Sequence, residues 1–261
     1  MNTTSRIAKL VLIGLMLTAC TVAPLPAVPV ATPATPTANL VEATATTQVS
    51  TTPQATPIPI NPINMYALTD QLIVAAETGD TAAVESLLTQ GANINGQDAR
   101  GRTPVMAATH GNQVEAVRML IQAGADIDIR DQRLDNPFLY AGAEGLLEIL
   151  KLTIEAKADT KLTNRFGGTA LIPACERGHV EVVRELLTRT DVDINHVNNL
   201  GWTALLEAII LSDGGPRHQQ IVQMLLDHGA DVNIADKDGV TPLQHARQRR
   251  FREIEQILLS R

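Results

Sequence analysis

The feature that most limits the fold of this 261-residue chain is an internal repeat in its second part. "RTPVMAATHGNQVEAVRMLIQAGADIDIRD" at 102–131 matches "GTALIPACERGHVEVVRELLTRTDVDINHV" at 168–197, and "VTPLQHARQRRFREIEQILLSR" at 240–261 closes the series. The slot that begins each unit recurs at intervals of 33, 33, 34 and 38 residues, at Thr103, Asn136, Thr169, Thr203 and Thr241. A fixed period of about 20 to 50 residues indicates stacked repeats rather than a single globular core.

Each unit reads as two short helices joined by a turn. Threonine caps a helix N-terminus, and in three units a proline follows at or near the first helical position. Four threonines are therefore expected to cap first helices: Thr103, Thr169, Thr203 and Thr241. Glycines are expected to end the first helix at Gly111, Gly145 and Gly178, and the second helix in a left-handed conformation at Gly124 and Gly229.

The pattern Thr-Pro-Leu, then Gly, then Leu-Leu, then Gly-Ala-Asp resembles the ankyrin repeat. The resemblance covers the chain from about residue 65 to its end. It implies an all-α repeat fold, an α-solenoid of about six stacked helix-turn-helix units with short β-hairpin fingers, preceded by a disordered linker. The six units are expected at approximately 65–98, 99–131, 132–164, 165–197, 198–236 and 237–261.

Two units depart from this pattern. In the third unit Asn136 replaces the initial Thr, Leu134 the finger Gly and Lys157 the Gly of Gly-Ala-Asp, which makes it the weakest match. The fifth unit carries extra residues, "LSDGGPRH" at 211–218, between its two helices. We expect this insertion to lengthen a surface loop without disturbing the stack and to offer a second contact site.

The N-terminal segment has the layout of an export signal. Two basic residues accompany an apolar run, 7–17, that is shorter than the roughly 20 residues needed to span a bilayer. The "LTAC" that follows at 17–20 resembles the lipobox of bacterial lipoproteins. That resemblance implies a signal peptide over 1–19 and a diacylglyceryl group on Cys20. The alternative is an ordinary signal peptide in which the cysteine is incidental.

Residues 20–64 are rich in Pro, Thr and Ala and carry one charge, on Glu42. Proline keeps such a chain extended, and few large apolar side chains are present to collapse it. We expect lipidated Cys20 and a disordered tether that holds a folded domain, 65–261, away from a membrane. The expected location is the bacterial cell membrane or outer membrane, with the domain facing the periplasm or the cell exterior.

No catalytic constellation is recognisable in the sequence. The six histidines are dispersed, and there is no His-Glu-x-x-His, paired-cysteine or phosphate-loop motif. Acidic pairs such as Asp126 and Asp128 fit turn formation better than calcium binding. Cys175 is interpreted as a small buried residue of a first helix. The sequence therefore predicts a non-enzyme that holds neither a cofactor nor a metal.

Composition narrows the range of partners. The net charge is −7 and no five like charges are consecutive, which argues against nucleic acid. Aromatic residues are 2% of the chain, so aliphatic side chains must build the core, as suits helices stacked on helices. We expect a monomer that binds a protein, takes no small-molecule substrate and meets the membrane only through its lipid.

The ankyrin resemblance implies a concave binding surface made of finger tips and the exposed side of the first helices. Arginine and tryptophan are enriched among interface hot spots. Projection onto this surface gives eight candidates: Arg100, Arg102, Arg133, Phe166, Leu200 and Trp202 on successive fingers, and Tyr140 and Arg177 on first helices. Four neighbouring positions complete the surface: Thr109, Glu144, Glu207 and Ile210. For Phe166 and Trp202 the alternative is packing between adjacent fingers.

The leading functional hypothesis is a non-catalytic scaffold, tethered to a membrane by its N-terminal lipid, that binds a partner protein through this concave surface. One alternative is an envelope enzyme or redox protein that uses Cys175, which would require an exposed thiol with a lowered pKa. The other is a purely structural spacer, in which the finger residues would be freely replaceable.

Overall fold

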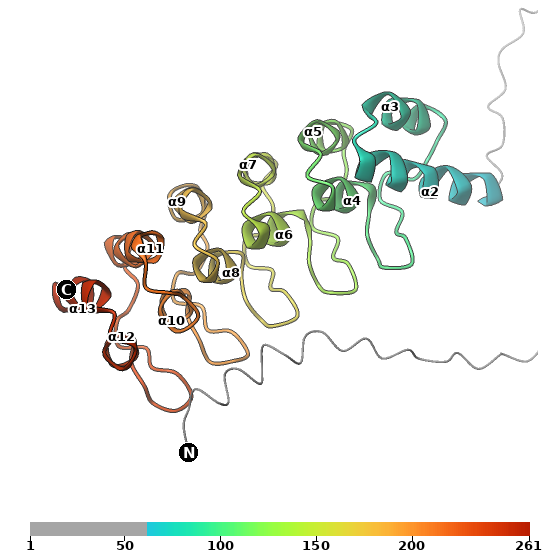
Figure 1. Cartoon of the computed structure of the whole chain (residues 1–261). Coiled ribbons are helices and arrows are strands. Elements are labelled where there is room, and N and C mark those ends of the chain that lie inside the picture. The colour runs from blue at the N-terminus through green and yellow to red at the C-terminus, as the bar shows by residue number, and fades with distance from the viewer. Residues whose placement is uncertain (1–61) are drawn as a thin grey trace, which may run out of the picture. The chain divides into compact units, whose positions relative to one another are not determined.

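In the computed structural model the described residues, 62–261, form two rows of short helices (Figure 1). The first helices of the units make one row: α2 (Pro62–Thr78), α4 (Pro104–His110), α6 (Pro137–Glu144), α8 (Leu171–Glu176), α10 (Ala204–Ile210) and α12 (Pro242–Arg249). The second helices make the other: α3 (Thr81–Thr89), α5 (Val114–Gln122), α7 (Leu147–Glu155), α9 (Val180–Arg189), α11 (Pro216–Asp227) and α13 (Arg252–Leu259). The predicted stack of six helix pairs is confirmed, and loops project from its first-helix row (Figure 1).

The predicted signal peptide, Cys20 and the tether as far as residue 61 lie outside the described residues. The expected start of the folded domain at residue 65 moves slightly, because α2 begins at Pro62. Residues 62–64, assigned to the tether by composition, therefore belong to a helix. Across 62–261, no helix combines the length and the apolar character needed to cross a membrane.

The predicted caps form at three of the four threonines. Thr103, Thr203 and Thr241 each accept a hydrogen bond from the backbone N–H three residues later. Asn136 does the same for α6, because its side-chain oxygen accepts the N–H of Leu139 at 2.9 Å. The short polar side chain at this slot thus fixes the start of four first helices.

Thr169 is the exception, and the expected cap is wrong there. In the capped helices the carbonyl of this slot accepts an N–H four residues later, but in α8 that residue is Pro173, which has no N–H. The N–H of Ile172 donates to the Thr169 carbonyl instead, at 3.3 Å. The Thr169 hydroxyl is left buried without a hydrogen-bond partner.

The second helices end as predicted at Gly124 and Gly229, whose φ angles are 89° and 91°. In the third unit Lys157 occupies the same position with a φ of 63°. A residue with a Cβ atom pays roughly 1–2 kcal/mol for this left-handed conformation. The departure of the third unit from the pattern therefore leaves local backbone strain.

Aliphatic side chains fill the space between the two rows. Fully buried members come from every unit: Leu72, Val84, Val117, Leu120, Leu139, Leu150, Leu171, Leu186, Leu205, Leu225 and Ile254. Small residues let neighbouring units approach closely, since a Cβ atom on Gly142 would lie 2.8 Å from the Cβ of Ala170. Such stacking buries a face that no single unit could bury alone.

The insertion of the fifth unit is anchored rather than free. Residues 211–215 connect α10 to α11, which already begins at Pro216. Gly214 lies against the ring of Phe251, so that a Cβ atom at this glycine would approach the ring to 2.5 Å. Arg249 donates to the Ser212 carbonyl at 2.7 Å. The expectation of a loop that only lengthens the surface is corrected, because the segment forms part of the packing between the last two units.

Candidate functional site

The finger tips share one turn, built around a side-chain oxygen. Asp98 Oδ1 accepts the backbone N–H groups of Arg100 and Arg102, at 2.8 and 2.9 Å. The same pair of bonds recurs at the other four tips, where the acceptor is Asp131, Asn164, Asn198 or Asp236. Asp and Asn favour such turns. No strand occurs in residues 62–261, so the expected β-hairpins are corrected to single turns.

The residue two positions after each acceptor lies at the tip of its finger. Arg100, Arg133 and Phe166 occupy this position in successive fingers, and all three are exposed, as predicted. Backbone hydrogen bonds join the first tip to the second and the third to the fourth: Gln132 N–H donates to the Arg100 carbonyl at 3.0 Å, and Asn199 N–H donates to the Phe166 carbonyl at 2.9 Å. The fingers thus present their tip side chains in a row.

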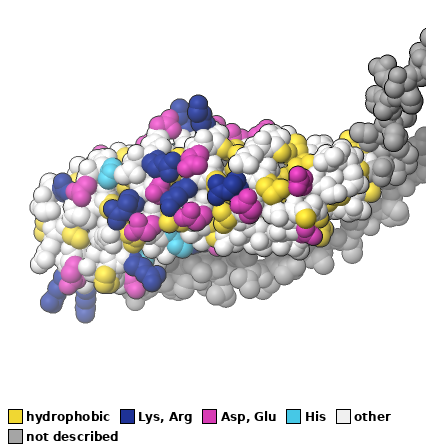
Figure 2. Space-filling model, turned by 90° about the horizontal axis from the view of Figure 1, so that it is seen from above, with side chains coloured by type: hydrophobic (Ala, Val, Ile, Leu, Met, Phe, Trp, Pro, Cys, Tyr) yellow, Lys and Arg dark blue, Asp and Glu magenta, His cyan; other side chains and the backbone are white. Residues whose placement is uncertain are grey.

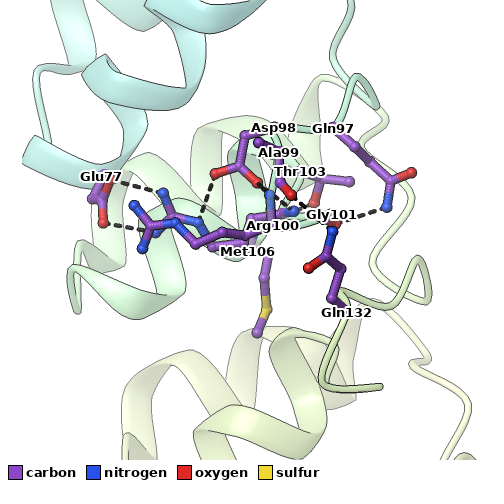
Figure 3. Close-up of polar contacts among 10 residues, drawn as sticks. Glu77, Gln97, Asp98, Ala99, Arg100, Gly101, Thr103, Met106 and Gln132 are labelled. Carbon is purple, nitrogen blue, oxygen red and sulfur yellow. Dashed lines mark hydrogen bonds and ion pairs between the residues drawn. The ribbon is translucent and has the colours of Figure 1, made fainter. Parts of the chain in front are cut away.

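Arg102 turns inward instead. Its side chain is 6% exposed, and its Nε lies 2.8 Å from Asp98 Oδ2. Its Nη1 and Nη2 donate to the two carboxylate oxygens of Glu77, at 2.7 and 3.2 Å. Figure 3 marks these bonds as the dashed lines that end on the labelled Glu77. These hydrogen bonds hold the pKa of the Glu77 carboxyl below its usual range. Arg102 is therefore corrected from a partner contact to a structural residue that ties the first finger to α2.

Leu200 and Trp202 are half-buried at the tip that Asn198 organises. Trp202 occupies the position equivalent to Arg102 in the earlier finger, four residues after the acceptor. Part of the Trp202 surface therefore stays exposed. Phe166 is 51% exposed. The alternative of packing between adjacent fingers therefore applies at most to the buried part of each of these two side chains.

The two first-helix candidates lie at boundaries between units. The ring of Tyr140 packs against that of His110, with centroids 4.0 Å apart and a tilt of 38°, and burial raises the pKa of the Tyr140 hydroxyl. Arg177 Nη1 donates to Glu144 Oε1 at 2.6 Å and to the Ala143 carbonyl at 2.7 Å. Both side chains keep an exposed part while joining α4 to α6 and α6 to α8.

Three of the neighbouring candidates are buried: Thr109, Glu207 and Ile210. Glu207 accepts a hydrogen bond from Asn198 Nδ2 at 2.7 Å. Burial raises the pKa of Glu207 to about 7, and the nearby Glu176 carboxylate adds to the shift. These positions belong to the interior of the first-helix row and offer nothing to a partner.

Three exposed side chains were missed as surface candidates: Arg130, Leu134 and Arg165. The Arg165 guanidinium carbon lies 4.7 Å above the centroid of the Phe166 ring. Leu134 is 42% exposed and has a φ of 62°. The sequence does carry a signal for Leu134, since it stands where the other fingers have glycine, but by itself that difference indicates only a weak match to the repeat.

Cys175 is fully buried, and burial raises the pKa of its thiol well above the usual value. A reactive cysteine requires exposure and a lowered pKa, so the condition set for a Cys175 enzyme is not met. Within the described part of the chain, no three His, Cys, Asp or Glu side chains converge where they could hold a metal ion. What the fingers offer is a row of exposed guanidinium and apolar groups, which suits binding.

Comparisons with known proteins agree with this geometry. Family models described as ankyrin repeats match residues 67–131, 138–236 and 216–259. The ankyrin repeat protein YahD of Escherichia coli (strain K12) is 45% identical over 188 residues, which are 72% of this chain and 94% of YahD.

Two solved structures extend the likeness to three dimensions. An ankyrin repeat domain from Acinetobacter baumannii AYE is 56% identical, with a TM-score of 0.70 over 72% of this chain and 96% of that one. The ankyrin repeat protein EF0377 is 39% identical, with a TM-score of 0.71 over 73% of this chain and 97% of that one. The repeat spacing, the paired helices, the recurring finger turn and these relatives together place the chain in the ankyrin repeat family.

Proposed function

We propose that this chain is a non-catalytic scaffold that binds a partner protein through the concave surface of its fingers and first helices. Ankyrin repeats typically serve as protein-interaction modules. The observation that carries the proposal here is the row of exposed tip residues Arg100, Arg133 and Phe166, with Trp202 half-exposed in the next finger. Arginine and aromatic side chains combine large contact area with directional bonds.

The face formed by the second helices, opposite the fingers, has a different arrangement of charges. Each of three second helices carries an acid and a base three residues apart, and these pair at 3.0–3.3 Å: Glu115–Arg118, Glu148–Lys151 and Glu181–Arg184. Figure 2 shows basic and acidic side chains interleaved along this face. Because its charges are already paired with one another, this surface is suited to contact with water. The tip arginines at 100 and 165, in contrast, have no carboxylate within ion-pair distance among the described residues.

The binding surface is tested by capture with two matched variants of the chain. The fingertip variant carries Arg100→Ala, Arg133→Ala and Trp202→Ala, and the outer-face control carries Arg118→Ala, Lys151→Ala and Arg184→Ala. We expect one envelope protein to be retained by the wild-type chain and the control, and lost by the fingertip variant at unchanged helicity and melting. Equal retention by all three would reject the concave surface, and no retention by any would favour a spacer.

We further propose that the domain is held at a bacterial membrane by lipid on Cys20 and faces the periplasm or the cell exterior. The "LTAC" at 17–20 and the Pro/Thr/Ala-rich residues that follow support this proposal. The test is growth with radiolabelled palmitate followed by detergent-phase partition of the full chain and of Cys20→Ala. Label and detergent-phase recovery in the wild-type chain alone are expected. An unlabelled wild-type protein that remains in the aqueous phase would reject the anchor.

A further inference from the structure

We propose that the partner is recognised through an acidic segment that also carries a large apolar side chain. This inference rests on the proposed function and adds the chemistry of the partner. The contact site is the tip patch, formed by six residues of three consecutive fingers: Arg100, Arg130, Arg133, Leu134, Arg165 and Phe166. The patch offers four guanidinium groups and two exposed apolar side chains, so an occupant must bring both carboxylates and an apolar group.

The first observation behind this proposal is the strained and exposed position of Leu134. The equivalent residue is Gly101, Gly167, Gly201 or Gly239 in the other four tips, and all of them have positive φ. Leu134 adopts the same conformation at φ 62°, although a Cβ atom makes it costly, and its side chain is 42% exposed. This leucine strains the backbone and contributes little to the core. A contact that its side chain makes in a complex would account for its presence at this position.

The second observation is the exposed ring of Phe166 and its contact with Arg165. Phe166 lies at the tip of the finger next to that of Leu134, with 51% of its surface exposed. The Arg165 guanidinium lies over its ring, 4.7 Å from the centroid, so the two groups already contact each other in the free chain. An ordered aromatic ring costs less conformational entropy on binding than a mobile one.

The local charge carries the third argument. The chain as a whole has a net charge of −7, yet its finger segments 98–102, 130–135 and 163–167 hold five arginines and three aspartates. Asp98 is engaged by Arg102, and Asp131 is buried where its side chain accepts backbone N–H groups. Asp135 is the remaining acid, 4.0 Å from Arg133. The exposed finger tips are therefore basic although the chain as a whole is acidic. This charge favours the binding of an acidic protein segment.

The test uses a random 12-residue peptide library displayed on phage and selected on the immobilised full chain. We expect the enriched peptides to be rich in Asp and Glu, with at least one Leu, Phe or Trp, and their affinity to fall as salt is raised. The most enriched peptide is then synthesised and titrated against matched variants. Arg100→Gln with Arg133→Gln and Arg165→Gln should weaken binding at least tenfold.

Leu134→Gly and Lys157→Gly are the decisive pair, because both replace a strained left-handed residue by glycine. Both should raise Tm by about 2–4 °C. Only Leu134→Gly should weaken the peptide, by about fivefold or more, while Lys157→Gly stays within twofold of the wild-type chain. Equal affinity of the two variants for the peptide would overturn the role of the patch.

Other outcomes separate this inference from the proposed function. Enrichment of neutral or basic peptides that still depend on the tip residues would reject the acidic partner and leave a concave binding surface. Peptides insensitive to every tip substitution, or no enrichment at all, would count against both. A dimer that Leu134→Gly dissociates, or a 12-nucleotide RNA bound tightly through the same arginines, would assign the patch to a second copy or to nucleic acid and overturn the proposal.

Discussion

Arg102 reaches back across the boundary between the first two units and donates to both carboxylate oxygens of Glu77, at 2.7 and 3.2 Å. Its guanidinium also meets Asp98, whose Oδ1 shapes the first finger tip. One side chain thus connects the end of α2, the finger of the next unit and the turn that presents Arg100. Removal of such a buried partner leaves charged groups without compensation.

We predict that Arg102→Ala lowers the free energy of unfolding by about 2–3 kcal/mol, because it leaves the carboxylate of Asp98 partly buried and unpaired. The matched control is Arg100→Ala, two residues away and exposed, which should change stability by less than about 0.5 kcal/mol. Urea titrations of the three proteins, followed by circular dichroism, measure both effects. Similar losses in the two variants would contradict the structural assignment of Arg102.

The same network predicts a pH dependence. The hydrogen bonds from Arg102 lower the pKa of Glu77 from 4.5, so this carboxylate stabilises the folded state above that pH and the contribution fades as the pH falls. Burial by itself raises the pKa of Asp98, but hydrogen bonds from the Arg102 and Arg100 backbone and the Arg102 side chain outweigh it and leave that pKa lowered as well. The stability gap between the wild-type chain and Arg102→Ala should therefore narrow between pH 6 and pH 3. A gap that is constant over this range would contradict the ion-pair interpretation.

Arg100 and Arg102 also show what the sequence can and cannot reveal. The repeat predicts local features well, because the residues that set them are adjacent in the chain: the threonine caps, the left-handed glycines and the helix pairs. It placed both arginines on the surface, since the partner of Arg102 is Glu77, 25 residues earlier and in another unit. Which tip residues turn inward depends on contacts between units, and the period alone does not specify them.

The same limit explains two other corrections. The 211–218 insertion is expected from the sequence only to lengthen a surface loop, because nothing near it in the chain indicates that Arg249 and Phe251 hold Ser212 and Gly214. Leu134 reads in the sequence as a weakness of the third unit, whereas the structure exposes its side chain at the finger tip, next to Arg133 in the chain. Pro173 did carry a local signal, since its missing N–H four residues after Thr169 follows from the sequence. The lipid on Cys20 stays a prediction.

The uncapped Thr169 gives a further test. Because its buried hydroxyl has no hydrogen-bond partner, Thr169→Val replaces an unsatisfied polar group by an apolar group of similar shape. We expect unchanged or higher stability, by up to about 1 kcal/mol. Thr103→Val is the matched change at a working cap, where the hydroxyl accepts the Met106 N–H at 3.3 Å, and it should cost about 1 kcal/mol. Equal losses in thermal unfolding would show that Thr169 has a partner after all.

Glu207 predicts the opposite pH response to Glu77. Burial raises its pKa to about 7, with the Glu176 carboxylate adding to the shift and the hydrogen bond from Asn198 opposing it. The folded state therefore binds more protons than the unfolded state between about pH 4.5 and 7, and stability falls as the pH rises through this window. Glu207→Gln should stabilise the chain by about 2 kcal/mol at pH 8 and by little at pH 4.5. The matched control is Glu253→Gln at an exposed position, which should show no pH-dependent gain in stability. A stability gain in Glu207→Gln that is the same at every pH would contradict the raised pKa of Glu207.

The contact between Gly214 and Phe251 makes the insertion sensitive to a single methyl group. Gly214 and Gly124 both have positive φ, 70° and 89°, so alanine strains the backbone at either position by roughly 1–2 kcal/mol. At Gly124 the added Cβ would meet nothing within 4 Å, whereas at Gly214 it would approach the Phe251 ring to 2.5 Å. Gly214→Ala should therefore cost about 3 kcal/mol or more, while Gly124→Ala should cost only the backbone strain. Thermal unfolding of the two variants measures the difference, and limited proteolysis should cut Gly214→Ala first within 211–218. If Gly214→Ala loses no more stability than Gly124→Ala, the Phe251 ring can move aside and does not hold the 211–215 segment in place.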